Sequence, residues 1–184
     1  MRKLTAFNFI SLNGMYKGAD DDISWHRHGE EEGEYSAQSL KADNILLFGR
    51  TTYEMMASWW PTPMAAEAFP EVARMMNTAE KIVFSNVIEE PRWHNTTAMS
   101  GDIVAQVRAM KAQPGKDMTI LGSGTIVSQF AEAGLIDEYR IMIDPVVLSG
   151  GTGIFSHMQQ GLELKLTGTK VFKSGTVLLT YHPG

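Results

Sequence analysis

The sequence predicts an α/β fold of three layers, in which helices cover both faces of a central, mostly parallel mixed sheet and an antiparallel hairpin closes the chain. Two observations support this prediction. Short apolar segments alternate with helical segments along most of the 184 residues, and this order is typical of parallel sheets covered by helices. Near the C-terminus, two alternating segments follow each other directly, as in a hairpin. No linker or repeat interrupts the chain, so residues 1–184 are expected to form one domain.

The first half of the chain carries four expected strands and three expected helices. Each strand is a short, mostly apolar run, and the acidic residues near position 30 suit the first turn of a helix. Pro61 stops the second helix and Pro70 splits the third. Strands are predicted at residues 3–12, 44–48, 81–84 and 93–98, helices at residues 30–42, 50–59 and 65–77, and a loop at residues 16–24.

The second half begins with an amphipathic helix over residues 102–112, which Asp102 can start. A strand at residues 118–121 then meets a glycine turn and a helix that Ser123 or Thr125 can cap and that ends near Gly134. Further strands are predicted at residues 138–143, 146–148, 162–172 and 176–181, with a break at Asp144-Pro145 and a flexible loop at residues 149–153.

The composition excludes several classes of function. The net charge is -5 and no run of Lys and Arg is present, so a nucleic-acid-binding face is not expected. The chain has no cysteine, which excludes disulfides, thiolate metal sites and cysteine nucleophiles. No apolar run reaches membrane-spanning length and no signal-peptide pattern opens the sequence, so a cytoplasmic protein without a membrane partner is expected.

Three loops that follow predicted strands are suited to binding phosphate groups. Gly49-Arg50-Thr51-Thr52 combines a helix N-terminus with hydroxyls and a guanidinium, which can contact phosphate through two hydrogen bonds. Ser85-Asn86 offers small polar donors, and Gly122-Ser123-Gly124-Thr125 offers backbone N–H groups at a helix start. Ligands in such sheets bind at the carboxyl ends of the strands, so the three loops are expected to cluster there. The alternative use of Arg50 is a surface salt bridge.

Five short motifs occur in one order along nearly the whole chain. They are Ser11-Leu12-Asn13-Gly14, Leu47-Phe48-Gly49-Arg50-Thr51-Thr52-Tyr53-Glu54, Val83-Phe84-Ser85-Asn86, Gly122-Ser123-Gly124, and Leu135-Ile136-Asp137-Glu138 leading to residues 145–153. Together they resemble the dihydrofolate reductase-like superfamily. The resemblance is greatest to the branch that contains the riboflavin-biosynthesis reductase (RibD C-terminal) domain and its small stand-alone relatives.

The resemblance implies an oxidoreductase that uses NADPH to reduce a small planar heterocyclic or carbonyl substrate of pterin, pyrimidine or flavin-precursor type. It also makes a homodimer plausible. By similarity, the phosphates and adenosine end of the cofactor would be held by Gly49, Arg50, Thr51, Thr52, Ser85 and Asn86. The pyrophosphate would be lined by Gly122, Ser123, Gly124, Thr125 and Ile126, and the nicotinamide would lie near Leu12, Asn13 and Gly14.

Two departures from the family leave the catalytic residues open. The riboflavin branch carries aspartate where Asn13 stands, and the carboxylate of the first helix in folate-reducing members has no clear counterpart. By position, Asn13 and Glu30 are the candidate catalytic residues, although the acids around Glu30 also resemble a solvated helix face. The proton donor is left open among residues 20–22, His28, Glu30 and a water molecule.

The aromatic residues are divided between pocket and core. Tyr16 and Trp25 are the candidate substrate-binding residues, because an aromatic surface suits the stacking of a planar ring. Core packing is the expected role of Trp59 or Trp60.

Two other functions are compatible with the residues. A nucleotide-binding module without turnover would use the same three loops and would explain the missing acid. A metal-dependent hydrolase would use His26 and His28 near the acids of residues 20–22, because imidazole and carboxylate together bind zinc or iron. The sequence places no third ligand, so a solvated loop is favoured and no metal site is predicted.

Overall fold

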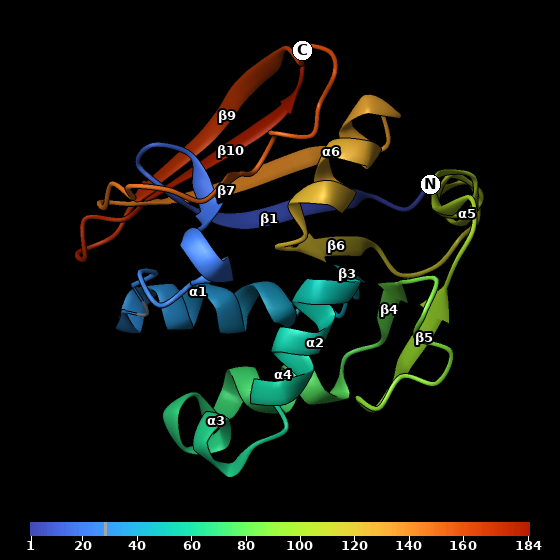
Figure 1. Cartoon of the computed structure of the whole chain (residues 1–184), viewed down its shortest axis with the longest axis horizontal. Helices are drawn as coiled ribbons and strands as arrows, with labels where there is room; N and C mark the ends of the chain where they lie inside the picture. The colour runs from blue at the N-terminus through green and yellow to red at the C-terminus, as the bar shows by residue number, and fades with distance from the viewer. Residues whose placement is uncertain (28) are drawn as a thin grey trace.

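A mixed sheet of eight strands forms the centre of the molecule in the computed structural model, which describes residues 1–27 and 29–184 (Figure 1). In spatial order its strands are β5 (Thr96–Met99), β4 (Lys81–Phe84), β3 (Ile45–Gly49), β6 (Met118–Leu121), β1 (Leu4–Ser11), β7 (Glu138–Asp144), β10 (Val177–Pro183) and β9 (Leu164–Val171). The helices are α1 (Glu30–Leu40), α2 (Arg50–Trp59), α3 (Pro63–Ala68), α4 (Pro70–Thr78), α5 (Ile103–Ala112) and α6 (Gly124–Glu132), with a 3-10 helix η1 (Ala19–Asp21).

The sheet is parallel except at its C-terminal edge. β1 lies between β6 and β7 and is parallel to both, with Leu4 opposite Met118 and Thr5 opposite Glu138. β3, β4 and β5 extend the parallel set. β10 pairs antiparallel with β7 and with β9, which confirms the predicted C-terminal hairpin. β3 and β4 are buried almost throughout, as expected for strands that helices cover on both faces.

Alternate residues of the same strands enter two separate cores, because successive side chains of a strand point to opposite faces. On one face, Leu47 of β3 packs with residues of α5 and α6, among them Val107 and Phe130. On the other face, Leu46 packs with residues of α1, α2 and α4, among them Tyr53. The expected three layers are therefore confirmed, and Figure 1 shows α6 and α1 on different sides of the strands.

The breaks between helices follow the prolines. Pro63 and Pro70 each occupy the first turn of a helix, where the missing N–H costs nothing. The helix predicted over residues 65–77 is therefore two helices, α3 and α4, as the split at Pro70 indicated. None of the helices in the described ranges is long and apolar enough to span a membrane.

Two expectations about irregular segments are wrong. Residues 146–148 do not resume the strand after Asp144, because Pro145 has no N–H for a ladder and the Val146 N–H turns back to donate to the carbonyl of Asp144 (2.8 Å). The loops expected at residues 16–24 and 149–153 contain two short strands, β2 (Met15–Lys17) and β8 (Thr152–Gly153), which pair antiparallel. Pairing of such short segments depends on a contact distant in sequence, which no local pattern reveals.

Candidate functional site

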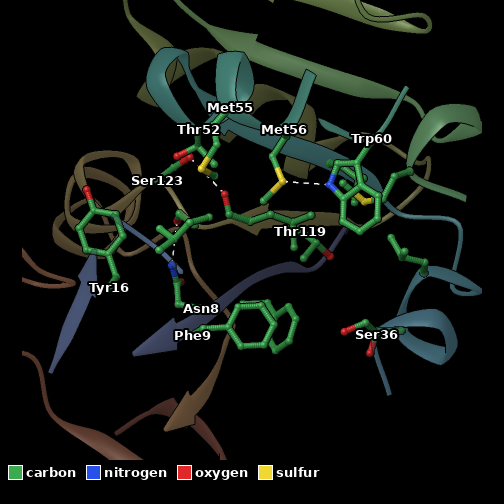
Figure 2. Close-up of a pocket in the computed structure, with 18 of the residues that line it drawn as sticks. Asn8, Phe9, Tyr16, Ser36, Thr52, Met55, Met56, Trp60, Thr119 and Ser123 are labelled. Atoms are coloured by element: carbon green, nitrogen blue, oxygen red, sulfur yellow. Dashed lines mark hydrogen bonds between the residues drawn. The ribbon is translucent and has the colours of Figure 1, made fainter. Parts of the chain in front are cut away.

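A cavity of about 1430 Å³ opens at the carboxyl ends of β3 and β6 and continues along the sheet face beneath α1 and α2 (Figure 2). Its wall contains all of the loop at residues 49–52 and residues 122–126, together with Tyr16 and Trp25. The expectation that the glycine loops meet at one edge of the sheet is therefore met for these two loops.

The two glycine loops are joined by a direct hydrogen bond. Ser123 Oγ accepts from Gly49 N–H at 2.9 Å, so Ser123 does not cap α6 with its side chain although it occupies the N-cap position. Ser123 is itself left-handed, with φ 57° and ψ 57°. Gly122 has φ +60°, and a Cβ there would lie 3.1 Å from Thr52 Cγ2. Both loops therefore form one preorganised wall.

The start of α6 lies within this wall and has the chemistry to hold an anion. The first amides of a helix have no acceptor inside the helix and lie at the positive end of its dipole. At α6 these amides follow Ser123, and the helix opens with Gly124, which lines the cavity. A Cβ on Gly124 would lie 2.7 Å from the ring of Tyr16, so glycine allows this close approach. Backbone N–H groups in such a position can hold a phosphate.

Asn8 supplies an unused hydrogen-bond acceptor at the base of the cavity. Its side chain is 1% exposed, and Nδ2 donates to the carbonyl of Gly122 at 2.9 Å. Within the described residues, Asn8 Oδ1 is buried without a hydrogen-bond partner. Leaving a buried acceptor unpaired is costly, so a ligand N–H that reaches it would gain the full hydrogen bond. The carboxamide of a nicotinamide is such a donor, so these residues fit the cofactor that the resemblance implies.

Arg50 is on the rim of the cavity and is paired with an acid of its own helix. Its Nη1 lies 3.1 Å from a carboxylate oxygen of Glu54, and about half of each side chain is exposed. The surface salt bridge considered as the alternative therefore exists in this structure. A phosphate at Arg50 would have to compete with Glu54.

Ser85 and Asn86 lie beside this rim rather than in the wall. Phe84, which lines the cavity, is opposite Gly49 in the β3–β4 pair, so Ser85 follows directly next to the Gly49 loop. Ser85 Oγ accepts from the N–H groups of Val87 and Ile88, both at 3.1 Å. Asn86 is exposed. Neither residue is among those that line the cavity.

The segment expected near the nicotinamide lies outside the cavity wall. Leu12 is 65% exposed, and neither it nor Asn13 nor Gly14 lines the cavity. Asn13 Oδ1 accepts from Ser11 Oγ (2.8 Å) and from Leu148 N–H (3.1 Å), and Nδ2 donates to the Leu148 carbonyl (2.9 Å). The amide of Asn13 therefore ties the turn after β1 to the loop after β7, a role that accounts for its hydrogen bonds without catalysis.

The acids of α1 are not one solvated face. Glu30 is exposed and lies outside the cavity, whereas Glu32 is 3% exposed, lines the cavity and accepts a hydrogen bond from Ser174 Oγ. The geometry therefore favours Glu32 over Glu30 as the carboxylate of the first helix. Ser36 and Leu40 follow Glu32 at steps of four residues and also line the cavity, and that spacing is the sequence signal that identifies Glu32.

A buried histidine–aspartate pair also borders the cavity, and it was not predicted. His26, which lines the cavity, has Nδ1 2.7 Å from Asp144 Oδ2, and the Asp144 side chain is fully buried. The other carboxylate oxygen accepts from Arg27 N–H (3.1 Å) and from Thr176 Oγ1 (3.4 Å). The ring of Phe9 is 3.7 Å from the imidazole, centroid to centroid. His26 and Asp144 are 118 residues apart, so no local pattern reveals the pair.

His26 pairs with Asp144, and two acids of the loop have other partners. Asp21 pairs with Lys17, and the Asp22 carbonyl accepts from Trp25 Nε1 at 3.0 Å. In the part of the chain that the structure describes, no group of three His, Asp or Glu side chains is arranged to hold a metal ion. His28 lies outside the described residues, so its predicted roles stay predictions.

The cavity contains aromatic residues that were predicted for the pocket and others that were predicted for the core. Tyr16 and Trp25 both line the cavity, as expected of substrate-binding residues. Trp60 packs against the core on the side of α1, α2 and α4, as expected of Trp59 or Trp60. Both tryptophans also line the cavity, and Trp60 Nε1 lies 3.0 Å from Met56 Sδ (Figure 2). Both tryptophans come at the end of α2, where the helix leaves the sheet and its side chains overhang the cavity.

Comparison with known proteins identifies related chains. The sequence pattern of the family described as RibD C-terminal domain matches residues 2–178. The "Uncharacterized protein YyaP" of Bacillus subtilis (strain 168) is 27% identical over 173 residues, which is 94% of this chain and 90% of YyaP. A diaminohydroxyphosphoribosylaminopyrimidine deaminase/5-amino-6-(5-phosphoribosylamino)uracil reductase from Thermotoga maritima has a TM-score of 0.73 at 13% identity, over 100% of this chain and 57% of that one. Dihydrofolate reductase from Enterococcus faecalis, complexed with NADP(H) and RAB-propyl, has a TM-score of 0.65 at 16% identity, over 99% and 96% of the two chains.

Proposed function

Because the chain belongs to the RibD C-terminal domain family, matched over residues 2–178, we propose that it is a reductase that uses NADPH to reduce a small planar heterocyclic or carbonyl compound. Two structural neighbours carry reductase names, and one of them is complexed with NADP(H). The observation that carries the proposal is the joined wall of glycine loops, with the Ser123–Gly49 hydrogen bond (2.9 Å) next to the buried Oδ1 of Asn8.

Each part of this wall has a proposed task in holding the cofactor. The amides at the start of α6 would bind the pyrophosphate, and Arg50, Thr51 and Thr52 would bind phosphate at the start of α2. Ser85 and Asn86, on the adjacent rim, would face the 2′-phosphate end. Oδ1 of Asn8 would accept the carboxamide N–H and so orient the ring. When bound, NADPH supplies the hydride.

Reduction of a C=N or C=O bond also needs a proton on the nitrogen or oxygen. Among the described titratable side chains that are buried, His26 and Glu32 are those that line the cavity. The Asp144 carboxylate fixes the orientation of the His26 ring through its 2.7 Å bond to Nδ1. We therefore assign the proton supply to His26 and the orientation of a substrate N–H or O–H group to Glu32.

Fluorescence titration with NADPH, followed by a turnover assay, tests this function. The wild-type protein should bind NADPH and oxidise it in the presence of a pterin, a flavin precursor or a quinone. Deuterium at C4 of the reduced nicotinamide should then appear in the reduced product. Absence of NADPH binding would remove the proposal. Binding without oxidation of any compound would favour a nucleotide-binding module without turnover.

We also propose that the protein is a homodimer formed through β9. This strand ends the sheet order, and it exposes Leu166 (50%) and Val171 (73%). An edge strand with exposed apolar side chains is a ready site for pairing with a second chain. Light scattering should give the mass of two chains for the wild type and of one chain for a variant that carries Leu166→Lys and Val171→Lys. A wild-type monomer contradicts the proposal.

A further inference from the structure

The cavity is larger than one ligand needs. Small-molecule sites typically enclose ~300–1,000 Å³, whereas this cavity encloses about 1430 Å³. The glycine loops, at residues 49–52 and 122–126, line only one part of it, which we call the cavity mouth. The remainder extends along the sheet face under the C-terminal half of α2. The volume therefore leaves room for a second ligand beside a bound cofactor.

One part of this remainder is lined by apolar side chains, and we call it the methionine–tryptophan lobe. It is defined by the cavity-lining side chains Met55, Met56, Trp59, Trp60, Phe69 and Met75. Figure 2 shows Met56 and Trp60 on one side of the lobe, with Phe9 and Thr119 of the sheet on the other and Ser36 of α1 facing them. Flat aromatic walls separated by flexible thioethers suit a planar aromatic ring, because methionine adapts its shape to the ligand.

The charges around the cavity do not favour an anion in this lobe. Four bases line the whole cavity, Lys3, Lys17, Arg50 and Arg140, against six acids, Asp21, Asp22, Glu32, Asp43, Asp117 and Glu138. Three of the bases are already paired with acids, Lys17 with Asp21, Arg50 with Glu54 and Arg140 with Glu138. None of the four is among the side chains that define the lobe: Arg50 begins α2 and is paired with Glu54, whereas the lobe begins at Met55. A phosphate that is buried without a cation loses its hydration, and no ion pair compensates for that loss.

We propose that the methionine–tryptophan lobe is the substrate site and that it takes an uncharged, planar aromatic ring and rejects the phosphorylated form of the same ring. This inference rests on the proposed reductase function, whose cofactor would occupy the cavity mouth. It separates this chain from the Thermotoga maritima neighbour, whose name specifies a phosphoribosylamino substrate.

The lobe also contains polar groups that can orient such a ring. Thr119 Oγ1 accepts a hydrogen bond from Asn44 Nδ2 at 2.9 Å, which leaves the Thr119 O–H proton as a donor toward the ligand. Ser36 adds a second hydroxyl from α1 (Figure 2). A few polar groups among apolar walls are typical of sites that fix the orientation of a small ring.

Riboflavin and flavin mononucleotide are suitable probes, because they share one ring system and differ by a single phosphate. Lumichrome serves as the same type of ring without the ribityl chain. Each is titrated by fluorescence quenching with NADP⁺ present in excess, so that the phosphate sites at the cavity mouth are filled. The wild type should bind lumichrome and riboflavin, and flavin mononucleotide should bind about tenfold more weakly or worse.

A cation placed in the lobe should abolish this discrimination against the phosphate. Met56→Lys should bind flavin mononucleotide roughly tenfold more tightly than the wild type does, because an ammonium can pair with the phosphate. Met64→Lys is the matched control: Met64 is 63% exposed on α3 and does not line the cavity, so the wild-type order should persist. Thermal melting checks that each variant is folded, and Met55→Lys replaces Met56→Lys if the latter is not.

The outcomes separate this inference from the proposed function. Any of three results overturns the lobe assignment, even if NADPH binds. The wild type binds flavin mononucleotide as tightly as riboflavin or more tightly, the wild type binds neither lumichrome nor riboflavin, or the folded lysine variant keeps the wild-type order of affinities. Conversely, selective binding of the unphosphorylated rings by a protein that does not bind NADPH or NADP⁺ supports the lobe assignment and removes the reductase proposal.

Discussion

Replacing Arg50 by alanine should raise the dissociation constant for NADPH about tenfold and leave that for NADH almost unchanged. The two cofactors differ only in the 2′-phosphate, which is the group that a guanidinium on the cavity rim would recognise. The expected loss is therefore selective, and it reports on the phosphate rather than on the fold of the loop.

The magnitude follows from the present environment of Arg50. Its side chain is 50% exposed and lies 3.1 Å from Glu54. Separating an exposed pair of this kind costs ~0.3–0.5 kcal/mol, while hydrogen bonds to a charged group contribute ~1.5–3 kcal/mol. Because solvent screens a half-exposed side chain, the lower value applies, and ~1.4 kcal/mol corresponds to a factor of ten.

Glu54→Gln provides the opposite perturbation of the same pair. Without the competing carboxylate, Arg50 should bind NADPH about twofold more tightly, which is the factor equivalent to the cost of separating the pair. Fluorescence titrations with both cofactors, at low and high salt, measure these effects, and Arg74→Ala is the control because Arg74 is exposed on α4 away from the cavity. Equal losses for NADPH and NADH in Arg50→Ala, or no loss at all, would refute the reasoning.

Two further predictions concern buried charges. Asp144→Asn should lower the free energy of unfolding by ~1.5–3 kcal/mol, because it weakens the charge-assisted bond to His26. Urea titrations measure this change, and the exposed control Asp43→Asn should change the free energy of unfolding by less than ~1 kcal/mol. Similar effects of the two substitutions would argue against the buried pair. Burial lowers the pKa of Lys81 from 10.5 to about 8, so between these values the unfolded chain binds more protons than the folded chain and the stability contribution of this residue rises with pH. The free energy of unfolding of the wild type minus that of Lys81→Met should therefore increase from about pH 8 to about pH 10, and a flat or falling difference would contradict the shift.

The order of the elements was accessible from the sequence because each is encoded locally. In residues 81–84, three apolar residues follow Lys81, and such a run favours a strand that is buried on both faces. Pro70 divides two helices because it cannot donate a backbone hydrogen bond. The strand predicted at residues 146–148 is wrong because that prediction also used local sequence alone. An apolar run does not show whether the edge of a neighbouring strand is free to pair.

The candidate site was accessible only in part. The glycine loops stood out because glycine followed by a helix start has a local signature, and the structure places the two larger loops in one wall. The spacing to Leu40 places Glu32 on the inner face of the helix, but only the packing of α1 shows that Glu32 is buried and Glu30 is exposed. His26 and Asp144 carry no signature at all, because their 2.7 Å contact depends on how β7 meets the loop before α1.

By itself, the sequence determined the α/β order, the family resemblance and the positions of the glycine loops that are proposed to bind phosphate, because hydrophobic periodicity, proline and glycine act over a few residues. Only the tertiary structure decided that Glu32 lines the cavity while Glu30 does not, that His26 has a buried partner and that the tryptophans at the end of α2 line an apolar lobe. Those features result from contacts between segments distant in the chain, and such contacts exist only once the sheet has brought the segments together.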